Sequence, residues 1–446
     1  MDKLLDLPAL LLTLAVIFGL INHWFVKLPR TIGLVLIAML SALAFMGIDR
    51  LLPGLGLVAR TQELLEVIDL NKTLMEGMLS FLLFAGALHV NLGDLLGRKW
   101  LISTLASVGV LISTLLNGLG FWGLSILFGL DFGLPICLVF GALISPTDPV
   151  AVLATLKTVP VPKELKAVIA GESLFNDGVA VVVFSILVTV AFGLSGGSHG
   201  AEQAVHETSH ALAEAGASAA SAVQIPSAFD IGKLFLQEAV GGALLGLVGG
   251  LIAFYALRSL DDYVLEVMIT LALVTATYAI ALHLHLSGPI AMVIAGLLIG
   301  NQGTALAMSA KTKEHLELFW ELIDEILNAV LFLLIGVEIV VITLELPLFA
   351  LAAAVIVLAV GVRFIAVGVP ILLFRQANFI PGGHTRILWW AGLRGGISVA
   401  LALSLPVFEG KDIILAVTYA MVIFSILVQG LSVERILTYF YPNARK

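Results

Sequence analysis

Apolar residues dominate this chain in long runs, which short polar segments separate. A helix needs about 20 mostly apolar residues to cross the hydrocarbon core of a bilayer. The runs show no apolar–polar alternation and are too long for the strands of a membrane barrel. The pattern therefore predicts an all-α polytopic membrane protein with about 13 transmembrane helices. The candidate spans are residues 7–25, 31–48, 74–90, 101–127, 133–156, 165–194, 234–257, 263–282, 287–300, 316–341, 346–374, 387–405 and 413–431.

Composition agrees with this pattern. The chain is 60% hydrophobic and 12% charged, and its mean hydropathy is +1.10. Soluble domains carry roughly 25% charged residues, so this chain has about half the usual fraction. Its single cysteine, Cys137, cannot form an intramolecular disulfide. We therefore treat residues 1–446 as one integral membrane domain that is held together without disulfides.

The basic residues predict an orientation. An odd number of spans places the two termini on opposite sides, and Lys and Arg are enriched on the cytoplasmic side. If the N-terminus is outside, the inner side holds fifteen of the 23 Lys and Arg residues and the outer side six, while Arg363 and Arg394 fall within spans. We expect a multi-pass membrane protein with the N-terminus outside and the C-terminus in the cytoplasm.

One segment does not resemble a span. Residues 195–230 are rich in Ala, Ser and Gly, contain three His and lack Lys and Arg. Such a composition is typical of a flexible linker, and the lack of positive charge favours an outer loop.

A first polar cluster interrupts the span at residues 133–156. It reads Ser-Pro-Thr-Asp-Pro from Ser145 to Pro149. Each proline removes a backbone donor and disfavours helical geometry at the residue before it. Broken helices of this kind form the ion sites of transporters, and Asp148 lies inside the break. The alternative is a structural kink with a solvated carboxylate.

A second cluster, Gly-Glu-Ser-Leu-Phe-Asn-Asp-Gly from Gly171, lies in the span at residues 165–194. Residues four apart share a helix face, so Ser173 and Asp177 line one strip and Glu172 and Asn176 the next. Hard cations prefer such oxygen ligands. A polar helix start would explain Glu172, but it explains the deeper Asp177 poorly.

A third cluster is cationic. Arg363 lies between apolar residues in the span at 346–374. A buried Arg needs a carboxylate, and Glu172 is the best candidate. Arg394, Gly395 and Gly396 interrupt the span at 387–405, where glycines permit an open helix. Arg394 is a candidate gate at this break, or alternatively a helix-end charge that snorkels to the surface.

The two interrupted spans suggest an inverted repeat with the ion site between its halves. Each break lies in the middle one of three consecutive spans, in residues 101–194 and 346–431 respectively. We hold this as a hypothesis.

A competing motif, His-Glu-Thr-Ser-His at residues 206–210, matches the zinc-protease pattern H-E-x-x-H. His206 and His210 would share a helix face, with Glu207 as the base. The surrounding Ala/Ser/Gly segment offers no apolar scaffold to hold a site. A solvated loop is therefore favoured over metal binding, and a membrane protease is only a distant alternative.

The three clusters resemble the motifs of the sodium/proton antiporters of the NhaP and NHE type, in the monovalent cation:proton antiporter superfamily. The similarity rests on the octets from Ser145 and Gly171 and on Gly-Leu-Arg-Gly-Gly-Ile-Ser from Gly392. Weaker similarity covers residues 287–300 and 319–336, so the likeness extends over most of the chain.

The resemblance implies an NhaA/NapA-like fold with two broken crossing helices. A core part would comprise approximately residues 100–194 and 346–437, and a dimerisation part approximately residues 1–99 and 231–341. It also implies a homodimer in the lipid bilayer of the bacterial plasma (inner) membrane, with no cofactor, no nucleic-acid partner and no enzymatic activity.

The resemblance further implies residue roles. Asp177 would carry proton and cation in turn, and Na⁺ would bind to Asp148, Ser173, Asp177 and the Thr147 carbonyl. Burial disfavours the charged form of a carboxylate, so Asp177 would hold its proton until a cation replaces it.

Two other roles follow from the same resemblance. Glu172 and Arg363 would be a structural ion pair. Asn176 stands where electrogenic relatives have a second Asp, which suggests electroneutral exchange. The stretch Leu-Phe-Ala-Gly-Ala from Leu83 lacks the carboxylate that many relatives have there.

The expected function is exchange of a monovalent cation for H⁺ across the plasma membrane by alternating access. Na⁺ is the expected ion, and Li⁺ is a further candidate. A K⁺/H⁺ antiporter of the same fold is the alternative. An ion channel or organic-anion carrier is a more remote rival, because the acidic site disfavours anions and a channel would pass far larger currents.

Overall fold

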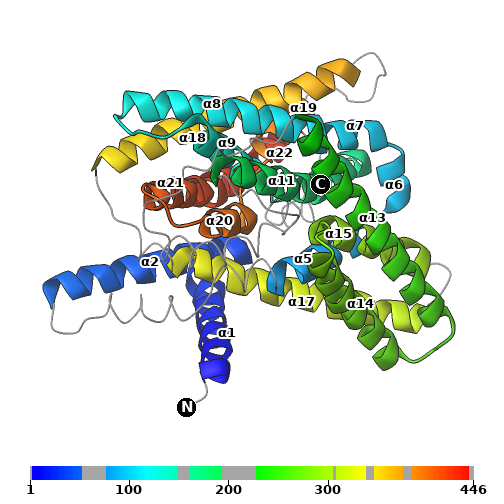
Figure 1. Ribbon diagram of the computed structural model, residues 1–446. Helices are drawn as coiled ribbons and strands as arrows, with labels where there is room; N and C mark the ends of the chain where they lie inside the picture. Colours follow the sequence, from blue (N-terminus) through cyan, green and yellow to red (C-terminus); the bar gives the residue numbers. More distant parts are fainter. Residues whose placement is uncertain are drawn as a thin grey trace.

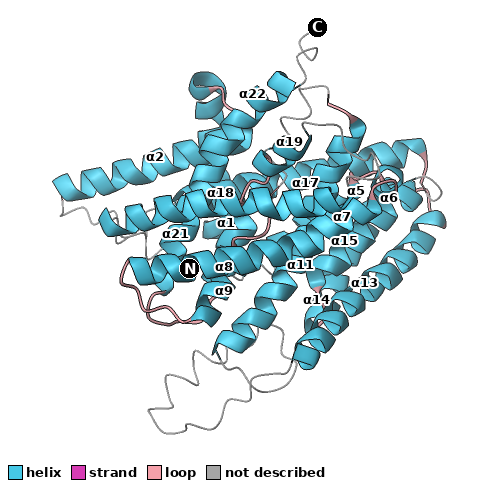
Figure 2. Ribbon diagram, turned by 90° about the horizontal axis from the view of Figure 1, so that it is seen from above, coloured by secondary structure: helices cyan, strands magenta, loops and turns pink. Residues whose placement is uncertain are grey.

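The computed structural model describes residues 3–52, 77–148, 152, 161–192, 228–304, 308–337, 346–374 and 384–440 of the chain. Helix is the only regular secondary structure among these residues, which confirms the predicted all-α class (Figure 2). The first part of the chain forms α1 (Lys3–Ile21), η1 (Asn22–Val26), α2 (Arg30–Leu51), α5 (Leu79–Leu88), α6 (Leu92–Leu96), α7 (Lys99–Thr104), η4 (Leu105–Gly109), α8 (Val110–Leu127), α9 (Leu134–Leu143) and α11 (Lys163–Phe192), where η denotes a π-helical turn.

The second part of the chain continues with helices of the same kind. They are α13 (Ala228–Arg258), α14 (Tyr263–His283), α15 (Gly288–Leu298), η5 (Ile299–Gly303), α17 (Ala310–Val337), α18 (Leu346–Phe374), α19 (His384–Trp390), α20 (Gly396–Leu403), α21 (Lys411–Phe424), η8 (Ser425–Gln429) and α22 (Gly430–Phe440).

The described helices include eight that are long and apolar enough to cross a membrane. Three shorter apolar helices, Leu79–Leu88, Leu134–Leu143 and Gly288–Gly303, coincide with further predicted spans. The protein is therefore a multi-span membrane protein. The total of thirteen crossings and the inverted repeat stay predictions.

The helices form an upper and a lower group in Figure 1. In the upper group α8 packs against both α9 and α18. In the lower group α17 packs against α2 and α5, and α15 packs against α5 and α13. α11, α20 and α21 lie between the groups, and α11 contacts helices of both. The interior between the groups therefore collects side chains from distant parts of the sequence.

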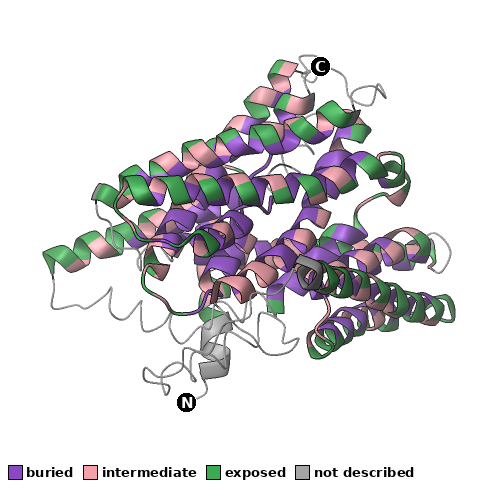
Figure 3. Ribbon diagram, turned by 45° about the horizontal axis from the view of Figure 1, so that its top comes forward, coloured by how far each residue is buried: buried purple, intermediate pink, exposed green. Residues whose placement is uncertain are grey.

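Many outward faces are apolar and exposed. Figure 3 shows exposed positions along the outer helices and buried positions toward the middle. On α13 and α14 the exposed residues include Leu236, Ile252 and Met268. An apolar surface of this extent is unfavourable in water and matches the hydrocarbon of a bilayer.

Small residues allow the helix backbones to approach closely. A Cβ on Gly141 of α9 would lie 2.1 Å from the Thr114 carbonyl oxygen of α8, and one on Gly246 of α13 would lie 2.2 Å from that of Ala291 on α15. Helix pairs in membranes rely on such contacts because hydrophobic burial gives little net gain there. These glycines fix the helices that flank the interior.

Candidate ion-binding site

The first helix break is present and buried. α9 ends at Leu143, and residues 145–148 have no regular structure. Pro146 lacks the backbone donor that a continuing helix needs. The Ser145 hydroxyl donates to the Gly141 carbonyl at 2.7 Å and satisfies one of the last acceptors of the helix. Thr147 is thereby held in a non-helical segment in the protein interior.

The second break separates α19 from α20 and meets the first. The Asp148 N–H donates to the Leu393 carbonyl at 2.8 Å. A Cβ on Gly395 would lie 2.0 Å from Asp148 Oδ2, so this position has room only for glycine. Gly396 opens α20, and its own Cβ would meet the Leu331 side chain of α17 at 2.5 Å. The two unwound segments are therefore in direct contact.

Arg394 links the two breaks. It is 1% exposed, and its Nη1 donates to the Ser145 carbonyl at 2.7 Å and to the Pro146 carbonyl at 3.0 Å. These carbonyls are left without helical partners where α9 ends. The alternative of a charge that snorkels to the surface is wrong, because the guanidinium points into the protein and neutralises a helix C-terminus.

Two residues that sequence reasoning did not identify support this contact. The Ser425 hydroxyl accepts from the Arg394 backbone N–H at 2.7 Å and donates to Gln429 Oε1 at 2.7 Å. Both side chains are buried in η8, a π-helical turn, and such turns are frequent at functional sites. In the sequence, these two polar residues stand four apart in an otherwise apolar run, and this spacing could have identified them as neighbours on one helix face.

Glu172 and Arg363 form a buried, two-pronged ion pair. Nη1 and Nη2 of Arg363 donate to Oε1 and Oε2 of Glu172, each at 2.9 Å. Paired donors of this type match the planar carboxylate in geometry as well as in charge. A Cβ on Gly392 would lie 2.4 Å from Arg363 Nε, so the second break also packs against this pair.

Thr147 connects the first break to α11. Its hydroxyl accepts from Asn176 Nδ2 at 3.0 Å and lies 3.3 Å from Ser173 Oγ. The same Asn176 amide donates to Glu172 Oε1 at 2.9 Å, whereas Thr147 Oγ1 lies 3.5 Å from Glu172 Oε2, at the long limit of hydrogen bonding. Thr147, Glu172, Ser173 and Asn176 thus form one buried network.

Asp177 lies in a different environment one turn further along α11. It is 5% exposed, and its Oδ1 has no hydrogen-bond partner among the described residues. Asp148 and Glu172 are close enough for their charges to act on it. An isolated buried carboxylate is costly, so this group requires a proton or a cation.

Direct contacts therefore connect only some of the predicted ligands with one another. The Thr147 and Ser173 hydroxyls lie 3.3 Å apart, whereas Asp148 and Asp177 are related only through the action of one charge on the other. The two buried arginines donate instead to Glu172 and to the Ser145 and Pro146 carbonyls. An arrangement with hydroxyl and carboxylate oxygens in the interior has the donor types that hard monovalent cations prefer.

Some predicted features lie outside the described residues. These are Pro149, residues 195–227 of the outer loop predicted at 195–230, and the motif with His206, Glu207 and His210. The end of that loop was predicted wrongly, because residues 228–230 already form the first turn of α13. The span at 74–90 is described from residue 77, and Ala85, in the stretch from Leu83 that lacks a carboxylate, is fully buried.

Comparison with known proteins decides the family. Residues 11–439 match the model of the family described as sodium/hydrogen exchanger, transmembrane. The chain belongs to the sodium/hydrogen exchanger family. This exchanger is 45% identical to the Na⁺/H⁺ antiporter NhaP of Pseudomonas aeruginosa over 446 residues, which cover 99% of this chain and 98% of the relative.

Other relatives of the exchanger agree. The Na⁺/H⁺ antiporter NhaH of Halobacillus dabanensis is 34% identical and covers 81% of each chain. The solved structure of the sodium proton antiporter MjNhaP1 from Methanocaldococcus jannaschii matches with a TM-score of 0.66 at 19% identity, and the match covers 96% of each chain. This likeness confirms the predicted antiporter fold. These relatives give no support to a K⁺-specific exchanger or a membrane protease.

Proposed function

We propose that this exchanger carries Na⁺ and H⁺ in opposite directions across the bacterial inner membrane, with both ions competing for Asp177. Relatives at 45% and 34% identity carry the name Na⁺/H⁺ antiporter. The observation that carries the proposal is that the buried Asp177 has an Oδ1 without a hydrogen-bond partner among the described residues. The two helix breaks, which contact each other through Asp148 and Leu393, lie next to this stretch of α11. A proton or a cation can neutralise this group, but both cannot occupy it together.

The mechanism follows from that competition. With Asp177 protonated or cation-bound, the interior has no uncompensated charge and the site can pass from one side to the other. With Asp177 empty and ionised, the crossing would move a bare charge through low dielectric, which is costly. Asp148, Ser173 and the Thr147 carbonyl would complete the Na⁺ shell, and Li⁺ is a further substrate to test.

We further propose electroneutral exchange, one H⁺ for each Na⁺. Asn176 cannot release a proton, and its amide already donates to Thr147 and Glu172. Only Asp177 is then left on this stretch of α11 to exchange a proton. Transport should be insensitive to a potassium diffusion potential that valinomycin imposes, and potential-dependent rates would contradict the one-to-one ratio.

The decisive experiment is proton movement in sealed proteoliposomes with an imposed pH gradient. Na⁺, Li⁺ and K⁺ are added separately to the wild type, to Asp177→Asn and to the control Asp94→Asn, which removes an exposed carboxylate on α6. We expect Na⁺ to collapse the gradient with the wild type and the control but not with Asp177→Asn. Collapse by K⁺ alone would favour the K⁺/H⁺ alternative, and unchanged activity in Asp177→Asn would refute the role of this residue.

The remaining parts of the proposal concern organisation. We propose a homodimer, a dimerisation part at approximately residues 1–99 and 231–341, a core part at approximately 100–194 and 346–437, and an outer N-terminus. Cys137 is the only cysteine and is buried, so a Cys137→Ser background permits single-cysteine labelling. An impermeant thiol reagent applied to cells should label Lys233→Cys and spare Lys313→Cys. The reverse pattern would invert the orientation.

A further inference from the structure

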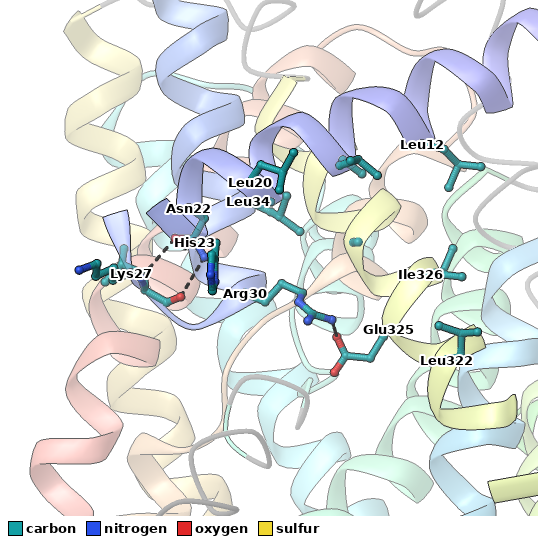
Figure 4. Close-up of a pocket in the computed structure, with 15 residues that line it drawn as sticks. Leu12, Leu20, Asn22, His23, Lys27, Arg30, Leu34, Leu322, Glu325 and Ile326 are labelled. Carbon is teal, nitrogen blue, oxygen red and sulfur yellow. Dashed lines mark hydrogen bonds and ion pairs between the residues drawn. The ribbon is translucent and has the colours of Figure 1, made fainter. Parts of the chain in front are cut away.

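A groove of about 850 Å³ lies where α1, the start of α2 and α17 come together (Figure 4). Its walls are apolar and exposed, with Leu12, Val16 and Leu20 from α1 facing Leu322 and Ile326 from α17. Ligand pockets typically measure about 300–1,000 Å³ and combine apolar walls with a few polar groups. The groove has the size and lining of a binding site, and it is separate from the buried ion-binding residues.

One end of the groove is basic. Figure 4 shows His23 between Lys27 and Arg30, with the Arg30 side chain extended toward Glu325 and the Lys27 side chain directed the other way. Arg30 Nη1 bonds Glu325 Oε2 at 2.8 Å, which leaves other donors of its guanidinium for a ligand. Lys27 is exposed and forms no ion pair within the described part of the chain. The basic end therefore carries more positive than negative charge.

The turn that carries these basic residues is held in place. Asn22 Nδ2 donates to the Leu28 carbonyl at 2.9 Å, and Asn22 Oδ1 accepts from the Leu28 N–H at 3.2 Å. Lys27 has φ of +56°, a left-handed conformation that is uncommon for a residue other than glycine. The backbone that carries the basic residues between α1 and α2 is thus held in a fixed geometry, which lowers the entropic cost of binding.

Neighbouring residues place the basic end at the membrane surface. Trp24 and Phe25 lie in the same turn and are 61% and 77% exposed. Aromatic side chains are enriched at the level of the lipid headgroups, and basic residues beside them face the phosphate layer. The apolar part of the groove then extends from headgroup level into the hydrocarbon region.

We propose that the groove binds one anionic phospholipid, with its headgroup at the basic end that His23, Lys27 and Arg30 line and an acyl chain between α1 and α17. Basic pockets between transmembrane helices recognise such headgroups. A zwitterionic lipid carries its own ammonium group, so its headgroup is attracted less strongly to the basic end of the groove. An apolar helix from a second copy of this chain would fill the space between the apolar walls but would bring no negative charge to the basic residues.

Native mass spectrometry of the full-length protein tests the headgroup. Detergent-purified protein is incubated with equal amounts of phosphatidylglycerol and phosphatidylcholine that have the same acyl chains. We expect preferential retention of phosphatidylglycerol, and Lys27→Gln should weaken it about fivefold, the factor for one basic residue at an anionic surface. The control Lys311→Gln removes one exposed positive charge from the start of α17, outside the groove, and should change nothing.

A second variant tests the acyl-chain position. A Cβ on Gly19 meets nothing within 4 Å, so Gly19→Leu fills the groove without a backbone clash and favours the helix. It should remove retention of the tightly bound lipid, whereas Gly47→Leu on α2, equally unobstructed but outside the groove, should not.

Three results would overturn the proposal. The first is equal retention of the two lipids by the wild type. The second is unchanged phosphatidylglycerol retention in both Lys27→Gln and Gly19→Leu. The third is a loss of dimer in Gly19→Leu with lipid retention intact, which would assign the groove to a second copy of the chain.

Discussion

Glu172 and Asp177 are buried carboxylates on the same helix, five residues apart, and the protein surrounds them in opposite ways. Both oxygens of Glu172 accept from Arg363, and Oε1 also accepts from Asn176. Oδ1 of Asp177 has no partner among the described residues, and the neighbouring charges that act on it are negative. Burial alone therefore does not identify a transport residue, since both side chains are buried.

The two carboxylates differ in whether a fixed positive charge of the protein balances their negative charge. A carboxylate that is bonded to an arginine and an amide gains nothing from a proton or a cation, and its charge is already balanced. A carboxylate in the same interior without a fixed countercharge must take its compensation from a mobile ion. The first arrangement stabilises the fold, and the second is suited to transport. This comparison predicts that stability and activity respond separately to substitutions at the two positions.

Glu172→Gln should have the largest effect on stability. It leaves Arg363 buried without a countercharge, and breaking a buried pair in this way costs about 3–5 kcal/mol. Asp177→Asn removes an uncompensated carboxylate and should leave the melting temperature similar or higher. Thermal unfolding in detergent, followed by tryptophan fluorescence, measures both. Equal melting temperatures for the two variants would show that the carboxylates are not differently compensated.

The double variant Glu172→Gln with Arg363→Gln provides the matched control. It removes both charges together, so its melting temperature should exceed that expected from the sum of the single losses. Additive losses would mean that the two side chains stabilise the fold independently.

Asn176→Asp should have the next largest effect, because it gives Glu172 a like-charged neighbour. The amide that donates to Thr147 and Glu172 would be lost, and each buried group left unsatisfied costs about 1–3 kcal/mol. We expect lower stability and, if the variant is purified intact, sensitivity of transport to membrane potential. Asn176→Gln keeps the amide and adds one methylene, so it tests whether size alone is responsible.

Gly395→Ala tests the Asp148 side of the site with a smaller change. The added Cβ would lie 2.0 Å from Asp148 Oδ2, and overpacking of this kind typically costs about 1–3 kcal/mol. Since the affected side chain belongs to the proposed Na⁺ ligands rather than to the ion pair, we expect the half-saturating Na⁺ concentration to rise more than stability falls. Gly361→Ala on α18, where a Cβ meets nothing within 4 Å, is the control. Unchanged Na⁺ dependence would remove Asp148 from the ligand set.

The sequence was sufficient to predict much of this arrangement, and the reasons are local. Pro146, Gly395 and the apolar runs act through backbone geometry and hydropathy, which depend little on the rest of the fold. Arg363 needed a carboxylate, and the structure places it on Glu172, although the structural role of that pair stays a prediction. The roles of Asp148, Thr147, Ser173 and Asp177 in transport likewise stay predictions.

Other features depended on tertiary contacts that no local pattern specifies. Arg394 lies near the end of a helix, where a long side chain can reach the surface or turn inward. The free carbonyls of Ser145 and Pro146, 249 and 248 residues earlier in the chain, decide between these directions. Ser425 and Gln429 interrupt an apolar run only briefly, and their importance follows from the backbone donor they meet.

Ser425→Ala should have the smallest of these effects and tests whether the second break matters to transport without touching either carboxylate. It leaves the Arg394 N–H and Gln429 Oε1 without their buried partner, at a cost of about 1–3 kcal/mol, and relaxation of the flexible Gln429 side chain should keep the loss near the lower limit. Ser425→Thr retains the hydroxyl and should restore the exchange rate at saturating Na⁺, whereas a purely steric role would make Thr the worse substitution. Because Arg394 acts on the break and not on the ion, the rate should fall while the half-saturating Na⁺ concentration stays constant. A change in that concentration alone would instead indicate that Ser425 influences the ligands of the cation.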